Sequence, residues 1–264
     1  MIAEHNYIGA NTSWIDVGDN TRAFLTTPKD GTGPFPAVII GHERYGLVQH
    51  TLDLAAKWAS YGYVCVAPDM ASHWEGDKEA LNRGDIGLTL TDDQVRYYYG
   101  LCLDYLLEAS GVDSACIASM GVCQSGGYPL LLNSIRPEVC ASLVIYGGSR
   151  TPEEVIAACT APILGIFGEA DHTMSIETVD AFRNLIQKHQ KSYEFTMYAD
   201  MPHGWLNDTM PGRYRQRAAE AVWIQMVQFL EKVSAGGFPR DRVRWRWESD
   251  ISTTYDFSKM VRLA

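Results

Sequence analysis

Short apolar runs alternate with longer helical patterns along most of the chain, and this alternation strongly limits the folds that are open to it. Ala37–Ile40 and Ile163–Phe167 are typical of buried strands, because each is a short apolar run bounded by proline and glycine. Between such runs, apolar residues recur three and four positions apart, as at Val95, Tyr99 and Cys102. Strands joined by helices of this length need crossover connections, so we predict an α/β fold with a mostly parallel central sheet and helices on both faces.

The same patterns predict the remaining elements. Further strands are expected at Tyr63–Ala67, Ala115–Ser119, Ala141–Tyr146 and Tyr193–Tyr198. Five helices are expected. The first begins at Leu52, the second runs from a capping box at Thr91 and Gln94 to Ala109, and the third follows a glycine-rich turn and ends at Leu132. The last two cover Ile176–Ile186 and Ala219–Val233. An antiparallel hairpin is expected near the start, where Gly18-Asp19-Asn20 separates two strand-like runs.

We predict one catalytic domain over residues 1–234, with two segments that depart from the pattern. Residues 71–90 are polar with little periodicity, and a loop of about 20 residues without structure is usually functional, so a lid-like loop is predicted. Residues 235–264 form a C-terminal extension with arginines and tryptophans interleaved: Arg240, Arg242, Arg244, Arg246, Trp245 and Trp247. This extension could cover its own domain, reach a neighbouring subunit of a homo-oligomer or form a short nucleic-acid patch, and the sequence leaves these alternatives open.

Composition and charge exclude several classes of protein. The 264 residues are 46% hydrophobic and 20% charged, as in ordinary globular proteins, and no apolar run is long enough to span a membrane. A net charge of −10 repels phosphate backbones and argues against a nucleic-acid partner. The N-terminus shows no secretion signal, so a cytoplasmic, reduced protein is expected, with five of its six cysteines (65, 102, 116, 140 and 159) as core residues.

The stretch Gly121-Val122-Cys123-Gln124-Ser125-Gly126-Gly127 lies between a predicted strand and a predicted helix. A nucleophile flanked by small residues at such a junction is typical of a nucleophile elbow, here with Cys123 where serine is usual. The turn would raise the thiol above the sheet, at a helix N-terminus whose N–H groups favour a thiolate. The alternative is a structural cysteine buried in a tight turn.

Two later strands end at polar residues that could serve this thiol. Asp171 follows the strand at Ile163–Phe167, and His203 follows the strand at Tyr193–Tyr198, which is the order nucleophile, acid, histidine of α/β-hydrolases. Parallel strands bring their carboxyl ends to one edge, so His203 is expected to take the thiol proton and Asp171 to orient the imidazole. The alternatives are a helix-capping Asp171 and a surface His203.

Other acidic residues and histidines could act as the general base or as the acid that orients it. Glu169 and His172 are the nearest rivals, because they lie in the same loop as Asp171. The remaining histidines, at positions 5, 42, 50, 73 and 189, do not follow a strand end in this way. For His50 and His189 a solvated helix end is the simpler interpretation.

Together with Gly41-His42-Glu43-Arg44-Tyr45-Gly46, these residues resemble the dienelactone hydrolase family of α/β-hydrolases, over roughly Pro28 to Val233. Members typically hydrolyse lactones or activated esters through a Cys-His-Asp triad, without metal or cofactor. The resemblance implies that Glu43 lies beside the thiol and accepts its proton when substrate enters. A Glu43 paired with Arg44 on a loop is the alternative.

The elbow also predicts where an oxyanion would be bound. One donor should be the backbone N–H of Gln124, directly after the nucleophile, and the second the N–H of Arg44, in the loop after the first long strand. Ser125 occupies a position where the family commonly has glycine, and it is small enough for the turn.

The expected substrate pocket departs from the family in its charge. Family members grip a substrate carboxylate with arginines, one of them soon after the histidine, but here Gly204–Asp208 follows His203 and only Arg83 in the lid-like loop remains as a candidate. Tyr146, Trp205 and Trp74 would instead form an aromatic pocket for a flatter or less charged molecule, unless each has only a core role.

The sequence therefore predicts a cofactor-free hydrolase that opens a small lactone or ester through an acyl-thioester on Cys123. Two alternatives stay open. One is a general carboxylesterase or an amide hydrolase on the same triad. The other is a non-catalytic protein whose thiol senses oxidants.

Overall fold

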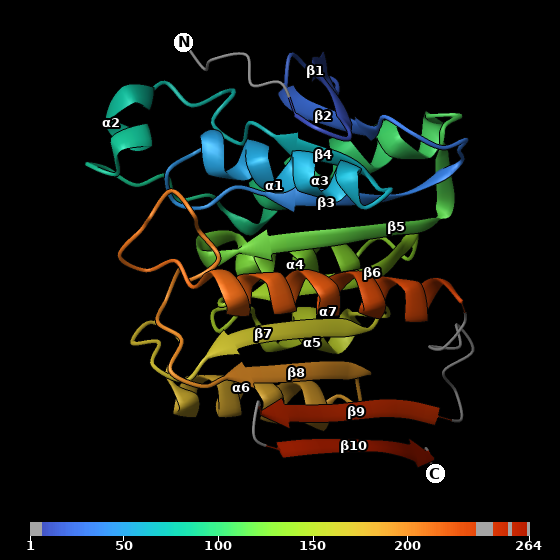
Figure 1. Ribbon diagram of the computed structural model, residues 1–264, viewed down its shortest axis with the longest axis vertical. Coiled ribbons are helices and arrows are strands. Elements are labelled where there is room, and N and C mark those ends of the chain that lie inside the picture. Colours follow the sequence, from blue (N-terminus) through green and yellow to red (C-terminus); the bar gives the residue numbers. More distant parts are fainter. Residues whose placement is uncertain (1–6, 236–244, 253–254, 263–264) are drawn as a thin grey trace.

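The computed structural model describes residues 7–235, 245–252 and 255–262, and a ten-stranded sheet runs through these residues (Figure 1). The strands are β1 (Ala10–Asp16), β2 (Arg22–Pro28), β3 (Phe35–Gly41), β4 (Val64–Pro68), β5 (Val112–Val122), β6 (Val139–Ile145), β7 (Ile163–Gly168), β8 (Tyr193–Tyr198), β9 (Trp245–Ser252) and β10 (Tyr255–Arg262). Their order across the sheet is β1-β2-β4-β3-β5-β6-β7-β8-β9-β10.

Pairing is parallel from β4 through β9 and antiparallel at both ends of the sheet. The predicted N-terminal hairpin is present, with Asp16 opposite Arg22. Because β3, β5, β6, β7 and β8 run in one direction, the loops that follow them gather at one edge of the sheet (Figure 1). The predicted mostly parallel sheet is confirmed.

Helices cover both faces of this sheet. They are α1 (Gln49–Ser60), α2 (Lys78–Arg83), α3 (Asp92–Glu108), α4 (Tyr128–Asn133), α5 (Glu153–Ala158), α6 (Ile176–Lys188) and α7 (Gln216–Ser234), with a 3₁₀ turn, η1 (Cys123–Gly127), before α4. One core cluster packs α1 and α7 against the sheet, and a second packs α3, α4, α5 and α6 against the other face. None of the helices in the described ranges combines the length and apolar character needed to cross a membrane.

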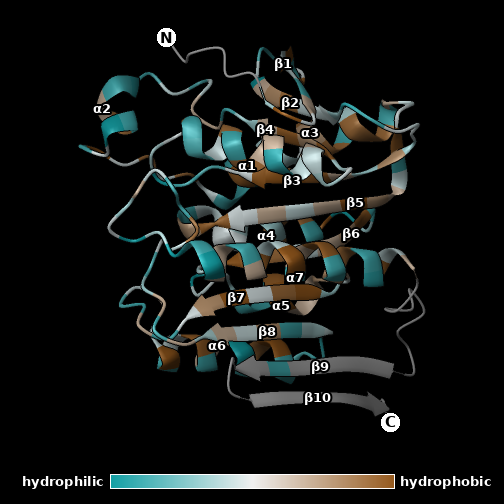
Figure 2. Ribbon diagram, viewed as in Figure 1, coloured by the Kyte–Doolittle hydropathy of each residue, from teal (hydrophilic) through white to brown (hydrophobic). Residues whose placement is uncertain are grey.

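The local sequence accounts for these elements. Thr91 caps α3 and its side chain accepts from the backbone of Gln94, whose side chain in turn bonds the Thr91 N–H, so the predicted capping box is confirmed. In α7 the buried positions Val222, Met226 and Phe229 recur at helical spacing, and Figure 2 shows apolar and hydrophilic stretches alternating along this helix.

The strands are continuously apolar because both of their faces are buried. In β3, Ala37 and Ile39 pack into the cluster of α3 to α6, whereas Val38 and Ile40 pack into the cluster of α1 and α7. Successive side chains of a strand point to opposite faces, so each face receives every second residue. This arrangement anchors the strand ends from which the polar loops emerge.

The segment 71–90 is not the structureless loop that its polarity predicted. It contains α2, where Asp77 accepts a hydrogen bond from Ala80 N at 2.9 Å and Gly84 ends the helix with a left-handed φ of 78°. A small apolar cluster holds the segment together: Ala71, Leu81 and Leu88, with Trp74 and Leu90 packed against it. Figure 1 shows α2 at the edge of the sheet toward which β3 and β5 point.

Part of the C-terminal extension continues the sheet of the same chain. β9 pairs in parallel with β8, and Asp250 of β9 accepts a hydrogen bond from Tyr193 Oη at 3.0 Å and lies 3.6 Å from Arg183. Arg240, Arg242 and Arg244 lie outside the described residues, as do the side chains of the other arginine and tryptophans of that run. The division of the chain at residue 234, where α7 ends, stays a prediction.

We expect a chain that ends at Ser234 to be less stable and more prone to aggregate, because removal of β9 leaves the hydrogen-bonding groups of β8 unpaired at a sheet edge. Thermal unfolding and light scattering measure the two effects, with Asp250→Asn in the full chain as the control for the side-chain contacts alone. Size-exclusion chromatography of both chains tests the predicted homo-oligomer contact. Unchanged unfolding and scattering would mean that β9 is dispensable to the domain.

Candidate active site

The turn at Cys123 is held in a strained backbone conformation by close packing. Cys123 has φ of +58°, in the left-handed region that a cysteine seldom adopts, directly after β5. A Cβ on Gly121 would lie 1.9 Å from the carbonyl oxygen of Ser125, and one on Gly126 would lie 2.6 Å from Cα of Gly147. Gly121 and Gly126 of the predicted elbow are therefore required by backbone contacts. The helix after the turn is shorter than expected, with a five-residue η1 before α4.

Ser125 links this turn to the neighbouring strand. Its buried hydroxyl accepts from the backbone N–H of Val122 at 2.9 Å and lies 3.0 Å from two acceptors, the carbonyl oxygens of Gly41 and Val122. A hydroxyl has one proton to donate, so it bonds one of these oxygens at a time. Serine thus fits the turn and adds a contact to β3 that a glycine could not make.

The structure brings Cys123, His203 and Asp171 together at the carboxyl edge of the sheet. Sγ of Cys123 lies 3.0 Å from Nε2 of His203, and Nδ1 of His203 lies 2.7 Å from Oδ2 of Asp171. The other oxygen of Asp171 accepts from the backbone N–H groups of Thr173 and Met174, at 2.7 and 3.0 Å. The carboxylate is thereby held in one orientation, with Oδ2 left for the imidazole.

Burial and hydrogen bonding act in opposite directions on the charges of this site. Burial lowers the pKa of His203, but the hydrogen bonds to Asp171 and Cys123 outweigh it and raise that pKa to about 10. Burial raises the pKa of Asp171, and the hydrogen bonds from His203 and Met174 outweigh it, so the net shift is downward. An imidazolium would donate from both ring nitrogens, toward the carboxylate and toward the sulfur.

The other cysteines differ from Cys123 in their surroundings. Cys65, Cys102 and Cys159 are buried, and burial raises the pKa of each thiol, to about 12 for Cys159. Cys116 and Cys140 are half-buried rather than core residues. Cys123 is also half-buried, and its sulfur contacts the imidazole of His203. Among the described residues, no group of three or more histidine, cysteine, aspartate or glutamate side chains could hold a metal ion.

The other residues considered for the roles of Asp171 and His203 take no part in the described hydrogen bonds of the thiol and its imidazole. Glu169 and His172 are exposed, whereas the Asp171 side chain is fully buried beneath His203. His189 ends α6 and pairs with Glu153, as expected for a helix end. The expectation of a solvated His50 is wrong, because its side chain is only 2% exposed.

Tyr146 contacts the imidazole but does not line an open pocket. Its ring meets that of His203 edge to face at a centroid distance of 5.0 Å, and the residue is fully buried at the end of β6. Among the residues that the structure describes, its hydroxyl has no hydrogen-bond partner within normal distance. Burial, followed by the charges of Glu43 and Cys123, raises the pKa of Tyr146, so the phenol stays neutral. The ring thus packs against His203, and contact of Tyr146 with a substrate stays a prediction.

Glu43 is buried near the site, but its carboxylate contacts groups other than the thiol. Oε2 accepts from the amide of Asn207 at 2.8 Å and lies 3.8 Å from Nε2 of His50. The alternative pairing with Arg44 is wrong, since the Arg44 guanidinium instead donates to the carbonyl of Gly84. His50 in turn lies 3.7 Å from Asp208, which connects this buried pair to the surface.

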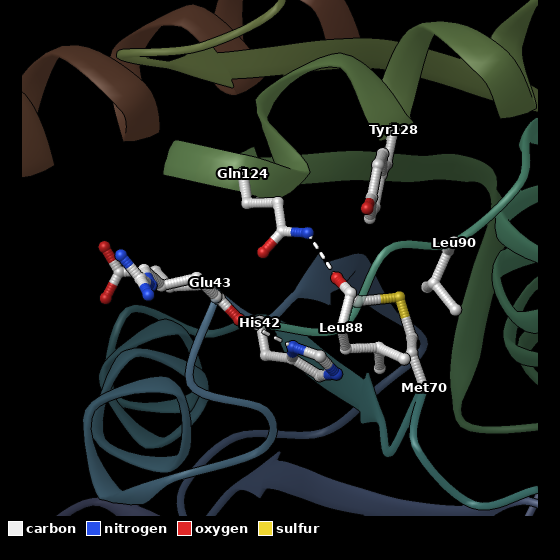
Figure 3. Close-up of a pocket in the computed structure, with 8 residues that line it drawn as sticks. His42, Glu43, Met70, Leu88, Leu90, Gln124 and Tyr128 are labelled. Carbon is white, nitrogen blue, oxygen red and sulfur yellow. Dashed lines mark hydrogen bonds between the residues drawn. The ribbon is translucent and has the colours of Figure 1, made fainter. Parts of the chain in front are cut away.

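Gln124 and Arg44, whose backbone N–H groups are the predicted oxyanion donors, also donate hydrogen bonds from their side chains to the segment 71–90. Gln124 donates to the carbonyl of Leu88 at 2.5 Å and Arg44 to that of Gly84 at 3.2 Å. Figure 3 shows the Gln124 amide reaching across a small recess toward Leu88. The recess is lined by His42, Glu43, Arg44, Met70, Leu88, Leu90, Gln124 and Tyr128.

Three expected pocket residues do not reach this recess. Trp205 is fully buried in the core and packs against Tyr198 at a ring distance of 5.0 Å. Trp74 packs within the segment 71–90, and Arg83 is 59% exposed and pairs with Asp85. Trp205 is therefore excluded as a lining residue of an open pocket, whereas contact of Trp74 and Arg83 with a substrate stays a prediction.

Sequence reasoning missed Asn207, His50 and the lining role of His42. Asn207 lies four positions after His203, in the stretch where the family has an arginine. Its amide is a sequence signal for a polar contact at that position. No sequence pattern predicts that His50, the second residue of α1, is turned inward to Glu43.

Known proteins resemble this chain over most of its length. The family model described as "Dienelactone hydrolase family" matches residues 21–234. The chain belongs to the dienelactone hydrolase family. It is a hydrolase that acts on carboxylic ester bonds, including those of lactones.

Individual members of the dienelactone hydrolase family match over most of their length. A Bradyrhizobium protein named "Probable 2-oxo-3-(5-oxofuran-2-ylidene)propanoate lactonase" is 30% identical, over 82% of this chain and 92% of its own. An Escherichia coli K12 protein named "Putative carboxymethylenebutenolidase" is 27% identical, over 84% and 86%. The crystal structure of a Klebsiella pneumoniae protein called "Putative Dienelactone Hydrolase" superposes with a TM-score of 0.76 at 22% identity, over 85% of this chain and all of that one. The α/β-hydrolase fold is thereby established.

The raised pKa of His203 predicts a stability that depends on pH. An unfolded histidine titrates near 6.5, whereas folded His203 keeps its second proton up to about 10, so its contribution is full below about 6.5 and is lost as the pH rises toward 10. We expect the difference in unfolding free energy between wild type and His203→Gln, measured in urea, to shrink across that range. His172→Gln, at an exposed position after Asp171, is the control. A difference that stays constant or grows would contradict the assigned shift.

Proposed function

We propose that this chain opens a small lactone or ester by nucleophilic attack of the Cys123 thiolate, through an acyl-thioester intermediate. The observation that carries the proposal is the continuous contact from sulfur to imidazole to buried carboxylate, 3.0 and 2.7 Å long, at a turn with positive φ. A free cysteine has a pKa of about 8.5 and is only partly ionised at neutral pH, so an adjacent imidazole is the expected means of activation.

In the first half-reaction the sulfur would attack the carbonyl carbon. The backbone N–H groups of Arg44 and Gln124 would donate to the developing oxyanion, and each such donor is worth on the order of 10² to 10³ in rate. As the tetrahedral intermediate collapses, the carbon–oxygen bond breaks and Nε2 of His203 gives its proton to the leaving alkoxide. In a lactone that alkoxide stays attached, so the acyl-enzyme carries a free hydroxyl.

In the second half-reaction His203 would act in the reverse sense. Its neutral Nε2 takes a proton from water as the oxygen attacks the thioester, and collapse of this second intermediate expels the thiolate. The carboxylate of Asp171 stays ionised throughout and stabilises each imidazolium, as its two backbone hydrogen bonds and lowered pKa support. The product of a lactone is a hydroxy acid.

A neutral substrate fits the charges near the site better than a carboxylate does. The position where the family has an arginine is filled by the loop that carries Asn207, whose amide is used by Glu43. Arg83 is exposed and paired with Asp85, so it offers no fixed cation to the recess.

Of the two alternative functions that the sequence left open, one remains and one does not. A general carboxylesterase or an amide hydrolase on the same groups is distinguished by the ratio of lactone to anilide turnover, because an amine is the poorer leaving group. The non-catalytic thiol sensor is not retained, since membership of the family makes the chain a hydrolase.

We expect Cys123→Ala and His203→Ala each to lower kcat/KM by several orders of magnitude on a panel of lactones and aryl esters. Mass spectrometry of wild type quenched during turnover should detect an acyl group on the peptide that contains Cys123. Cys116→Ser, at a half-buried cysteine within β5, is the matched control and should keep its activity. Full turnover by Cys123→Ala would rule out the proposed nucleophile.

The proposed role of Glu43, acceptance of the thiol proton when substrate enters, predicts a separation of two rates. In the free protein the sulfur contacts His203 and the carboxylate contacts Asn207, so Glu43→Gln should alkylate with iodoacetamide at close to the wild-type rate. Its kcat/KM for esters should fall by about 10- to 100-fold if proton transfer to the carboxylate assists the reaction.

His203→Ala is the comparison for Glu43→Gln, since it should slow both alkylation and turnover. Equal losses in the two rates for Glu43→Gln would assign Glu43 to thiol activation in the free protein. No loss in either rate would remove it from the mechanism.

A further inference from the structure

The buried carboxylate of Glu43 meets an amide and an imidazole, and these differ in whether they can carry a proton. The amide belongs to Asn207, whose oxygen accepts from the backbone N–H and the hydroxyl of Thr209 at 3.0 and 2.6 Å. Its NH₂ group is therefore the part that donates to Glu43. An amide does not take up a proton at ordinary pH, whereas an imidazole gains and loses one near neutrality. His50 is thus the neighbour with which Glu43 can exchange a proton.

His50 lies between this buried carboxylate and an exposed one. Its side chain is 2% exposed, with Nε2 at 3.8 Å from Oε2 of Glu43 and Nδ1 at 3.7 Å from Oδ1 of Asp208. The Asp208 side chain is 56% exposed. One ring therefore faces the interior with one nitrogen and, with the other, a carboxylate that is in contact with solvent.

In the described part of the chain, no hydrogen bond fixes the His50 ring on either side. Both of its nitrogens are buried without a hydrogen-bond partner at normal distance, which is uncommon for buried polar atoms. Each gap exceeds a usual hydrogen bond by about 1 Å, so a small turn of the ring closes one gap and opens the other. A ring placed in this way can approach the two carboxylates in turn.

Asp208 is suited to pass a proton on to water. Its interaction with His50 outweighs burial and lowers the pKa of Asp208, with a further contribution from the charge of Lys57. Burial, followed by the charge of Asp208, raises the pKa of the nearby Tyr214, so that phenol stays neutral. The Asp208 carboxylate therefore stays ionised and does not retain a proton that reaches it.

The proposed reaction yields a proton that has to leave the site. Hydrolysis of a lactone consumes one water and gives a hydroxy acid, which at neutral pH ionises to a carboxylate and one proton per turnover. After burial, the charges of Glu43 and Cys123 are the next causes that raise the pKa of Tyr146, so both groups lie close to the same phenol. Glu43 is thus a buried base in the surroundings of the reacting sulfur.

We propose that His50 relays protons from Glu43 to Asp208, and so carries to water the proton that each turnover releases. The O–H bond of protonated Glu43 breaks as an N–H bond forms at Nε2 of neutral His50. The imidazolium turns outward, releases the proton through Asp208 to water, and returns as the neutral ring. This inference rests on the proposed function and extends the proposed role of Glu43. His50 acts through Glu43 and does not touch the reacting atoms.

Steady-state kinetics with phenyl acetate and δ-valerolactone in a dilute buffer test the relay. kcat/KM covers the steps up to acylation, whereas kcat also includes the return of Glu43 to its ionised form. His50→Gln keeps a donor toward Glu43 but cannot carry a proton, so kcat should fall by about 10-fold or more while kcat/KM changes by less than about 2-fold. Asp208→Asn, at an exposed position, should lower kcat in the same direction without risk to the fold.

Added imidazole distinguishes a relay from a packing role. His50→Ala leaves space for a small base beside Glu43, so imidazole in the buffer should restore kcat toward that of wild type. His189→Gln, at an imidazole that pairs with Glu153 at the end of α6, is the control and should keep its kcat with or without added imidazole. Wild-type kcat in His50→Gln, or equal losses of kcat and kcat/KM that imidazole does not restore, would overturn the relay.

The same assays separate the relay from the reaction that it serves. If Cys123→Ala keeps full turnover, the proposed reaction fails, whereas an inactive Cys123→Ala together with wild-type kcat in His50→Gln leaves the reaction standing and the relay wrong. A relay that begins at Glu43 has nothing to carry without it, so His50→Gln should not lower kcat further in Glu43→Gln. Additive losses in that double variant would also contradict the relay, and wild type without turnover of either substrate would overturn both proposals.

Discussion

The backbone contacts of the turn at Cys123 are the constraint on which the rest of the site depends. A Cβ on Gly147 would lie 2.4 Å from the carbonyl oxygen of Cys123, so the turn is pressed against the end of β6. That contact places Tyr146, the neighbour of Gly147, edge to face with the imidazole of His203. The strained φ at Cys123 is maintained because the strands on either side are buried in both cores and cannot move to relieve it. Packing thus determines where the sulfur, and with it the histidine, is held.

Two carboxylates near the sulfur are kept apart by their hydrogen bonds. Asp171 is tied by backbone N–H groups on one oxygen and by His203 on the other, and so it can only act through the imidazole. Glu43 accepts a hydrogen bond from Asn207 and lies near His50. Because like charges in one buried site destabilise each other, this division lets both acids remain near the thiol. The recess is lined by His42, by Glu43 and by Arg44, whose guanidinium already donates to the Gly84 carbonyl.

Much of the fold could be predicted from sequence because it follows from local rules. Continuous apolar strands, helical spacing and the Thr91 cap are properties of neighbouring residues, and they predicted β3, β7 and α3 within a few residues. The segment 71–90 was the main error. Its helix is held by Asp77 and by a cluster of three apolar side chains, too few to produce a visible period in a polar stretch.

In the candidate site, too, some residues could be predicted from the sequence and others could not. Cys123, Asp171 and His203 were found from sequence because each follows a strand, and parallel strands bring such positions together whatever the details of packing. The direction in which a long side chain points carries no such signal. Trp205 follows the same strand as His203 and yet turns into the core, while His50 begins a helix and turns inward to Glu43.

By itself, then, the sequence determined the order along the chain of strands β1 to β8 and of helices α1, α3, α4, α6 and α7. It also determined the three polar residues that follow strand ends, because these features depend on periodicity and on chain direction. Only the tertiary structure decided which side chains line the recess, which residue bonds the Glu43 carboxylate, and which nitrogen of His42 bonds the Glu43 carbonyl. Those outcomes depend on contacts between residues far apart in the chain, where a rotation of one side chain changes the partner and the chemistry offered to a substrate.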